Sequence, residues 1–421
     1  MVKLETRSSG RRTATRAAVR RFLLLCSPLL LLSPTVRADD LTIQGYLDFR
    51  AVLADDTRTW TDGGLGKTRW GGEGGVHFGG GALALGWQAT PTLLAFAELQ
   101  AQADGDPDVD LMIAYLRWRP ASSTPWRFAL RGGVFFPPVS LENDGIGWTS
   151  RWTLSPSAIN SWVGEELRAT GLEATLEHRG EHGTLQFGGA LFGRNEPAGE
   201  LLASRGWAIG DFTTGVHGRL RQPDVYAPRA FAGVPMTFRP FQRVTGALGG
   251  WGEVRFTSDV WGTWTAMHYD NRADPAAFVQ YDDRRLLAWR TSFDAVGVTH
   301  AFGDLRVVAQ WMGGHTAFEP QPGRYLDSEF DSAFVMAAWE RGAWRPAVRV
   351  ERFRVVQHGS DDPLSEDGHA LTVAMNWRPS ERWRFTAEWL RVSSERRQRV
   401  LEGLPREMVE TQVQLSARLI F

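Results

Sequence analysis

The residues whose types and spacing most suggest chemistry are His178, Glu181 and His182. They follow the order of a zinc-binding H-x-x-E-H motif, which needs a helix to bring both imidazoles to one face. Here the run crosses a predicted turn at 179–183, so a solvated turn is the favoured interpretation. The chain has a single cysteine, Cys26, and neither a G-x-S-x-G nor a phosphate-loop motif. The sequence therefore predicts no catalytic residue, no metal site and no cofactor.

A second kind of chemistry could come from arginines and carboxylates. Lys67 is the only lysine after residue 38, so nearly all cations there are planar, permanently charged guanidinium groups. Eight arginines fall on the polar sides of alternating segments, and four carboxylates fall in one long connection. Opposed charges around confined water create a transverse field that hinders apolar solutes and sets ion preference. The candidates are Arg50, Arg127, Arg131, Arg290, Arg306, Arg349, Arg384 and Arg418, with Glu142, Asp144, Glu165 and Glu166.

The first 38 residues have the layout of a signal peptide. Five arginines lie between positions 11 and 21, an apolar stretch follows at 22–32, and Val36-Arg37-Ala38 resembles a cleavage site. The apolar stretch is too short to span a bilayer as a helix. We therefore expect export, with a mature chain that starts at Asp39.

Removing this segment changes the charge of the chain. The whole chain has 47 basic and 48 acidic residues, and the first 38 residues hold eight of the basic residues and one of the acidic ones. The remaining 39 basic and 47 acidic residues give a net charge of −8, which argues against nucleic acid as a partner.

The last segment, 407–421, shows most clearly which elements position these charges. Apolar residues alternate there with polar ones, and the alternation ends on the aromatic Phe421. A period of two is typical of a β-strand with two chemically different faces. An apolar face that continues to the end of the chain suits lipid better than water.

The same alternation recurs along the chain and predicts sixteen strands in an all-β fold. A slip in the alternation at Arg352-Phe353 predicts a β-bulge. The expected strands cover 41–53, 76–87, 93–102, 109–119, 126–136, 169–176, 184–192, 244–256, 260–269, 287–295, 305–311, 333–339, 344–355, 371–377, 383–389 and 407–421.

The connections between these strands alternate in length. Those after even-numbered strands are short, and most of those after odd-numbered strands are longer and polar. This asymmetry and the even count are typical of a transmembrane antiparallel β-barrel with short periplasmic turns and long external loops. The two longest connections are 137–166, rich in Trp and carboxylates, and 193–241. Residues 39–421 thus form one predicted barrel domain, with 137–166 as a candidate constriction loop and 193–241 as an external loop.

Tryptophan supports a membrane setting. The chain has 19 Trp, many of them close to predicted strand ends. An interfacial aromatic girdle would place them there. Core filling in a large soluble β protein is the alternative explanation.

The chain resembles the general porins of bacterial outer membranes, in strand pattern along its whole mature length. The stretch from Gly133-Val134-Phe135-Phe136 to Ser161-Trp162-Val163-Gly164-Glu165-Glu166 is similar in size and position to the porin loop after strand five, which narrows the lumen. A terminal strand that ends on Phe, here Phe421, resembles the signal read by the barrel assembly machinery.

The resemblance implies a water-filled channel in the outer membrane of a Gram-negative bacterium, with 14 to 18 strands and no enzyme activity. Implied partners are outer-membrane lipid, the assembly machinery, small hydrophilic solutes and two further copies in a homotrimer.

Two other functions stay open from sequence. A substrate-specific channel would need an arginine ladder for anionic solutes or stacked aromatic residues for sugars. An outer-membrane hydrolase would need a Ser and His pair on the wall, and no such pair can be picked out from the sequence.

Overall fold

A computed structural model describes residues 40–225, 236–281, 284–359 and 364–421. The predicted signal peptide lies outside the described residues. Within them, no helix is long and apolar enough to cross a membrane.

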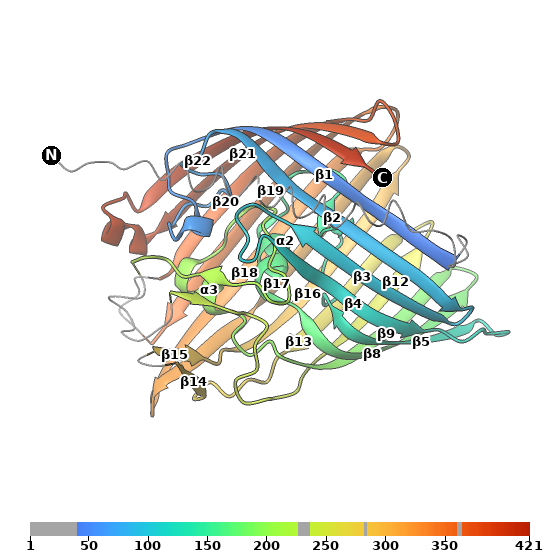
Figure 1. The fold of residues 1–421 in the computed structure, drawn as a ribbon, viewed down its shortest axis with the longest axis horizontal. Helices are drawn as coiled ribbons and strands as arrows, with labels where there is room; N and C mark the ends of the chain where they lie inside the picture. Colours follow the sequence, from blue (N-terminus) through green and yellow to red (C-terminus); the bar gives the residue numbers. More distant parts are fainter. Residues whose placement is uncertain (1–39, 226–235, 282–283, 360–363) are drawn as a thin grey trace.

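Sixteen antiparallel strands close into one barrel (Figure 1), which confirms the predicted fold class and strand count. The strands are β1 (Leu41–Ala54), β2 (Gly75–Thr90), β3 (Leu93–Ala101), β4 (Val109–Trp118), β5 (Trp126–Phe135), β8 (Ala169–Gly180), β9 (Gly183–Gly193), β12 (Gly249–Ser258), β13 (Gly262–Asp270), β16 (Arg290–Phe302), β17 (Leu305–Gln321), β18 (Arg324–Trp339), β19 (Trp344–His358), β20 (Glu366–Trp377), β21 (Trp383–Arg396) and β22 (Glu407–Ile420).

Closure depends on pairing of the first strand with the last. Residues Tyr46 to Ala54 of β1 pair with Ile420 back to Gln412 of β22. Phe421 extends this ladder, because its N–H donates to the carbonyl of Gly45 at 3.0 Å and its carbonyl accepts the Gly45 N–H at 2.8 Å. Every strand thereby has two neighbours, as lipid requires of a spanning sheet.

The two ends of the barrel differ. The end that carries the short connections, the start of β1 and the end of β22 is here called the turn end, and the opposite end the loop end. The loop-end connections hold short elements: η2 (Trp60–Asp62), β6 (Asn143–Gly145), β7 (Thr149–Ser150), α2 (Ala158–Glu166), α3 (Glu200–Arg205), β10 (Leu220–Arg221), β11 (Thr237–Phe238), β14 (Phe278–Tyr281), β15 (Arg284–Leu287) and η3 (Arg397–Glu402).

Most exposed tryptophans gather at one end of the barrel, the turn end, whereas the sequence predicted tryptophans near strand ends in general. They lie at or next to strand ends and have more than a third of their surface exposed: Trp87, Trp118, Trp126, Trp261, Trp264, Trp339, Trp344, Trp377 and Trp383. Eight other tryptophans are buried, most of them in the loops inside the barrel, and the girdle hypothesis did not foresee them.

The polarity of the wall reverses along the strands. Near the turn end the outward residues are apolar, as on β18, where Val335 is 50% exposed. Near the loop end the outward residues are charged, as in the pair of Arg354 with Asp331 at 3.0 Å, whereas the inward residues Phe330 and Phe353 are buried. The strands therefore continue past the hydrocarbon layer and pack their inner faces on the loops.

This reversal corrects two sequence predictions. The slip at Arg352-Phe353 is not a bulge, since β19 pairs with β18 and β20 without a register shift. Arg290 lies on the outer face of β16, where it binds Asp270 at 3.2 Å, and so it does not line the lumen. The strand pattern assumed one apolar outer face throughout, and that assumption fails beyond the lipid.

A charge placed in the apolar band should show where the lipid lies. Val335→Arg is expected to lower the free energy of unfolding by about 2–4 kcal/mol, the cost of an arginine near the bilayer midplane. The control is Val356→Arg at the loop end of β19, opposite Glu329, with an expected cost of about 0–1 kcal/mol. Urea unfolding in lipid vesicles measures both. Equal losses in the two variants would contradict the polarity boundary.

Candidate functional site

The loop between β5 and β8, residues 136–168 and here called L3, lies inside the barrel and crosses it. The carbonyl of Val139 accepts a hydrogen bond from Gln310 on β17 at 2.9 Å. The N–H of Gly147 donates to Glu98 on β3 at 3.0 Å. Contacts with strands on different sides of the wall are possible only for a loop in the lumen, where Figure 1 also draws α2.

Carboxylates of the wall hold this loop by its backbone. Glu388 of β21 accepts the N–H groups of Leu154 and Ser155 at 2.5 and 3.0 Å. Glu351 of β19 accepts the N–H of Ala158 at 2.7 Å. Hydrogen bonds to an ionised acceptor are about twice as strong as neutral ones. The fixed wall thus determines the course of L3.

The predicted pair of charges across the lumen is present for Arg349 and Glu142. Their side chains approach to 2.5 Å, and both are completely buried. Arg349 also donates to the carbonyls of Ser155 and Pro156 at 2.8 and 3.1 Å. This arginine fixes L3 on the wall and has no surface exposed to water.

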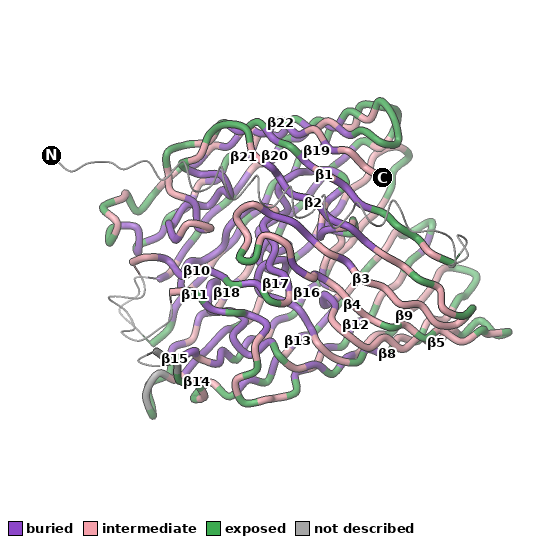
Figure 2. Tube along the Cα trace, viewed as in Figure 1, coloured by how far each residue is buried: buried purple, intermediate pink, exposed green. Residues whose placement is uncertain are grey.

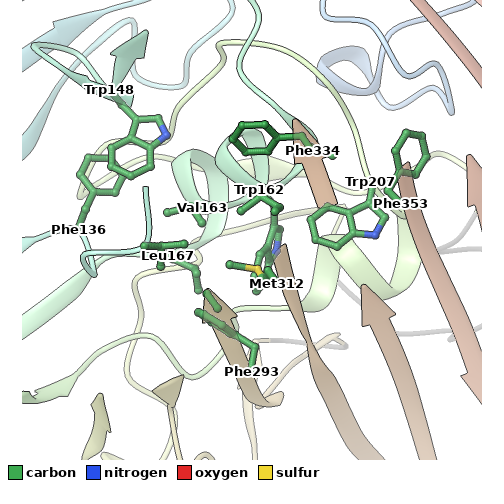
Figure 3. Close-up of a cluster of buried hydrophobic side chains, with 14 of the residues drawn as sticks. Phe136, Trp148, Trp162, Val163, Leu167, Trp207, Phe293, Met312, Phe334 and Phe353 are labelled. Atoms are coloured by element: carbon green, nitrogen blue, oxygen red, sulfur yellow. The ribbon is translucent and has the colours of Figure 1, made fainter. Parts of the chain in front are cut away.

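Helix α2 fills the centre of the barrel with apolar side chains. Ser157 caps its N-terminus by accepting the N–H of Asn160. The ring of Trp162 contacts Trp207, Phe293 and Phe330, with centroids 5.2 to 6.0 Å apart. Figure 3 shows Trp162 between Trp207 and Phe293. A fully buried aromatic side chain contributes about 1.5–3 kcal/mol. The helix is therefore part of the core.

A second loop, residues 194–248 and here called L4, also enters the barrel. Glu166 of α2 accepts the N–H groups of Leu201 and Leu202 in α3, at 3.1 and 3.3 Å. Glu165 binds Arg205 at 2.6 Å. The two predicted loop carboxylates are thus buried clamps between L3 and L4. The sequence placed 193–241 as an external loop, and its residues 194–215 are instead largely buried against L3 and the wall.

Asp211 of L4 is the centre of a charge network that the sequence did not predict. It binds Arg50 of β1 at 2.5 Å and Arg69 of the first loop at 2.9 Å. Arg50 also binds Asp48 at 3.1 Å, and Arg69 binds Asp104 at 2.6 Å. The two arginines hold the pKa of Asp211 well below its usual range. L4 is therefore tied to the barrel wall and to the two loops nearest to it.

The remaining predicted residues fall into three settings. Arg127 and Arg131 are half-buried on the inner face of β5, where Arg131 binds Glu173 at 2.7 Å. Arg306 binds Glu340 at 3.2 Å at the turn end. Asp144 pairs with Arg151 at the exposed tip of L3.

Arg384 and Arg418 lie side by side on β21 and β22. Arg418 binds Asp48 at 2.7 Å, whereas Arg384 donates to the carbonyl of Ser150 at 3.1 Å and to no carboxylate within the described chain.

The part of the inner wall open to solvent lies on β4, β5, β8 and β12. Arg131, Glu177 and Arg255 point inward there with 20 to 27% of their side-chain surface exposed. Figure 2 shows the corresponding intermediate burial along the turn-end parts of β5, β8 and β9. The charged groups on this part of the wall are therefore accessible to solvent.

The H-x-x-E-H run lies where the turn was predicted. His178 is near the end of β8, with its ring 4.5 Å from that of Trp126, and Glu181 and His182 form the turn to β9. Among the described residues, no group of three or more His, Cys, Asp or Glu is placed to hold a metal ion.

Comparison with known proteins identifies the class of this barrel. No family model matches the chain, and no curated protein matches it. Among solved structures, the outer membrane channel DcaP of Acinetobacter baumannii is 11% identical, with a TM-score of 0.52 over 93% of this chain and 100% of that one. OmpF of Salmonella typhi, solved with daunomycin, is 11% identical, with a TM-score of 0.50 over 90% and 97%.

The loop L8 deletion mutant of OmpT, an outer membrane protein of Vibrio cholerae, is 9% identical, with a TM-score of 0.51 over 90% and 99%. At this identity the likeness concerns the fold alone. The chain thus has the fold of the sixteen-strand outer-membrane porins, as the sequence resemblance predicted.

Removing the charge at the centre of the L4 network should weaken the docking of this loop. Asp211→Asn is expected to destabilise the docked loop by about 1–3 kcal/mol, because two buried arginines lose the carboxylate they share and keep only Asp48 and Asp104. Limited proteolysis of the folded barrel measures this as faster cleavage within L4. Asp144→Asn removes the exposed partner of Arg151 and should change the rate little, since such pairs contribute about 0–1 kcal/mol. Equal cleavage of wild type and Asp211→Asn would contradict the role of Asp211.

Docking of L3 and L4 should also depend on pH. Burial raises the pKa of Glu166 to about 7 and that of Glu200, which also faces the charge of Glu166, to about 8. A carboxyl pKa that is higher in the docked state means that the docked loops bind the proton more tightly than the released loops do. Docking is therefore most stable below pH 4.5, the ordinary carboxyl pKa, and it weakens as pH rises through 7 to 8. Cleavage within L4 should therefore speed up from pH 5 to pH 8, and Glu200→Gln should flatten this dependence. A rate that falls with pH would contradict the sign.

Proposed function

We propose that this protein is an outer-membrane porin that forms a water-filled channel for passive diffusion of small hydrophilic solutes and ions. The observation that carries the proposal is the solvent-exposed, charged inner wall of β4, β5, β8 and β12, within a closed barrel of sixteen strands. A barrel of about eight strands would be filled by its own side chains, whereas sixteen leave room for water. No covalent chemistry and no cofactor are needed for this function.

L3 and the charges around it are proposed to set the size and ion preference of the channel. The exposed pair of Asp144 and Arg151 is at the tip of L3. Arg127 and Arg131, with Glu173, lie on the inner wall of β5. Of the predicted constriction residues, these are the ones we expect solutes to meet. The buried Arg349, Glu142, Glu165 and Glu166 are instead expected to hold the loops in place.

A channel specific for anionic solutes is the second candidate, and the guanidinium of Arg384, which has no carboxylate partner within the described chain, favours it. A sugar channel would need aromatic rings along the accessible wall, and many buried rings pack on each other instead. An outer-membrane hydrolase is the remaining alternative. An assay on lipid and peptide substrates tests it, and turnover lost on Ser or His substitution would replace the channel proposal.

Assembly and location follow from the same proposal. We expect export through the periplasm, reading of the terminal strand with Phe421 by the barrel assembly machinery, and a homotrimer in the outer membrane of a Gram-negative bacterium. The porin fold supports these expectations. Chemical cross-linking in detergent, with a ladder that ends at three chains, tests the trimer.

Conduction in a planar bilayer tests the proposed function directly. The refolded mature protein is expected to give large, long-lived, ohmic current steps, and Asp211→Asn should give larger steps because L4 leaves the lumen. A salt gradient gives a reversal potential whose sign reports whether arginines or carboxylates dominate. Heat-unfolded protein is the control. Absence of steps from protein whose heat-modifiable gel mobility proves it folded would reject the open channel.

A further inference from the structure

Three arginines lie in one row across neighbouring strands at the turn end of the lumen. Arg384 of β21 is directly opposite Arg418 of β22. Arg378 follows Trp377, which is opposite Phe385, so continuation of this register places it on the other side of Arg384. Neighbouring strands are about 4.8 Å apart, and like charges placed opposite each other are destabilising. The row therefore needs a compensating negative charge.

The described chain supplies little of that charge. Asp48 binds Arg418 at 2.7 Å, but it is shared with Arg50, which it binds at 3.1 Å. Arg378 and Arg384 have no carboxylate within salt-bridge distance among the described residues, and neither does Arg345 on the adjacent β19. Like-charged Arg345 and Arg151 contribute, after burial, to lowering the pKa of Arg378 in the turn that follows β20. Glu340 acts on Arg378, and Asp48 and Glu388 act on Arg384, but only from beyond salt-bridge distance, so no carboxylate neutralises these two arginines directly.

Donor groups in this row remain unused. Arg384 is 4% exposed, and it donates through Nε to Asn376 at 2.9 Å and through Nη1 to the carbonyl of Ser150 at 3.1 Å. Its buried Nη2 has no partner, and neither does the buried Nε of Arg378. A buried guanidinium without its full set of acceptors costs free energy. A ligand with oxygen acceptors would remove that cost.

Access to the row comes from the tip of L3 and the turn end. Arg378 and Arg345 are half-buried, and Arg151 at the tip of L3 has 51% of its side chain exposed. Arg378 donates to the carbonyl of Arg151 at 3.4 Å, so L3 contacts the row without neutralising it. An anion that enters from the turn end would meet exposed guanidinium groups first and the buried Arg384 last.

We infer that Arg345, Arg378, Arg384 and Arg418 form a binding site for a small solute that carries a carboxylate or phosphate group. The forked donors of guanidinium match both groups. The inference rests on the proposed channel function for its role, which is to select anionic solutes from those that diffuse through. The site itself needs only the folded barrel.

Calorimetric titration of the folded protein in detergent tests the site, with inorganic phosphate and succinate as separate probes. We expect saturable binding of at least one probe, and the stronger one identifies the preferred group. Arg384→Gln and Arg378→Gln should each weaken it by about tenfold or more. Arg378 lies in a turn, so its substitution tests the site even where Arg384→Gln fails to fold. The control is Arg352→Gln, which removes an exposed outer-face arginine and should leave binding unchanged.

The outcomes separate this inference from the channel proposal. Binding lost in both row variants supports the site, whether or not the protein conducts. Absence of saturable binding by the wild type, or equal binding in Arg378→Gln, would overturn it even if large current steps are seen. In a conducting protein, the reversal potential of Arg378→Gln should also shift toward lower anion preference, a change that a purely structural role would not produce.

Discussion

Closure of the sheet between β1 and β22 is the constraint on which the rest of this structure depends. A bilayer offers no partners for backbone N–H and C=O groups, so an open edge in lipid would cost several kcal/mol for each unpaired group. Pairing of residues 46–54 with 412–420, and of Phe421 with Gly45, removes both edges. Once the sheet is closed, its inner face surrounds a space wide enough for loops and for water.

Within that space, both apolar packing and charged hydrogen bonds position the loops. Helix α2 presents Trp162 to rings of the wall and of L4, and this packing alone is not directional. Orientation comes from buried ions: Glu388 and Glu351 hold the backbone of L3, and Asp211 holds L4. Such ions are costly to bury, and they are tolerated here because nearly every one has several hydrogen-bond partners. In the arginine row at the turn end, Arg378 and Arg384 have no carboxylate partner among the described residues, and each has a buried nitrogen without an acceptor.

Two loops enter the lumen of this porin-like barrel, so its interior differs from that of a simple hollow cylinder. L3 and L4 are clamped to each other through Glu165 and Glu166, so movement of one loop requires release of the other. The solvent-exposed wall of β4, β5, β8 and β12 is free of these clamps. The clamped loops and the solvent-exposed charges therefore lie on different sides of the same barrel.

By itself the sequence determined the antiparallel barrel and its strand count, because a period of two is set by the geometry of a single strand and the connections separate the strands. It misassigned Arg290, since the pattern does not say where lipid ends. Arg378 lies two residues after Asn376 and so belongs to the same polar face. Extending the predicted strand 371–377 by one residue would have added Arg378 to the inward arginines. Only the tertiary structure brought Asp211 to Arg50 and placed Arg378, Arg384 and Arg418 in one row. Long-range contacts and cross-strand register depend on how segments pair, and the alternation within a single strand does not encode that pairing.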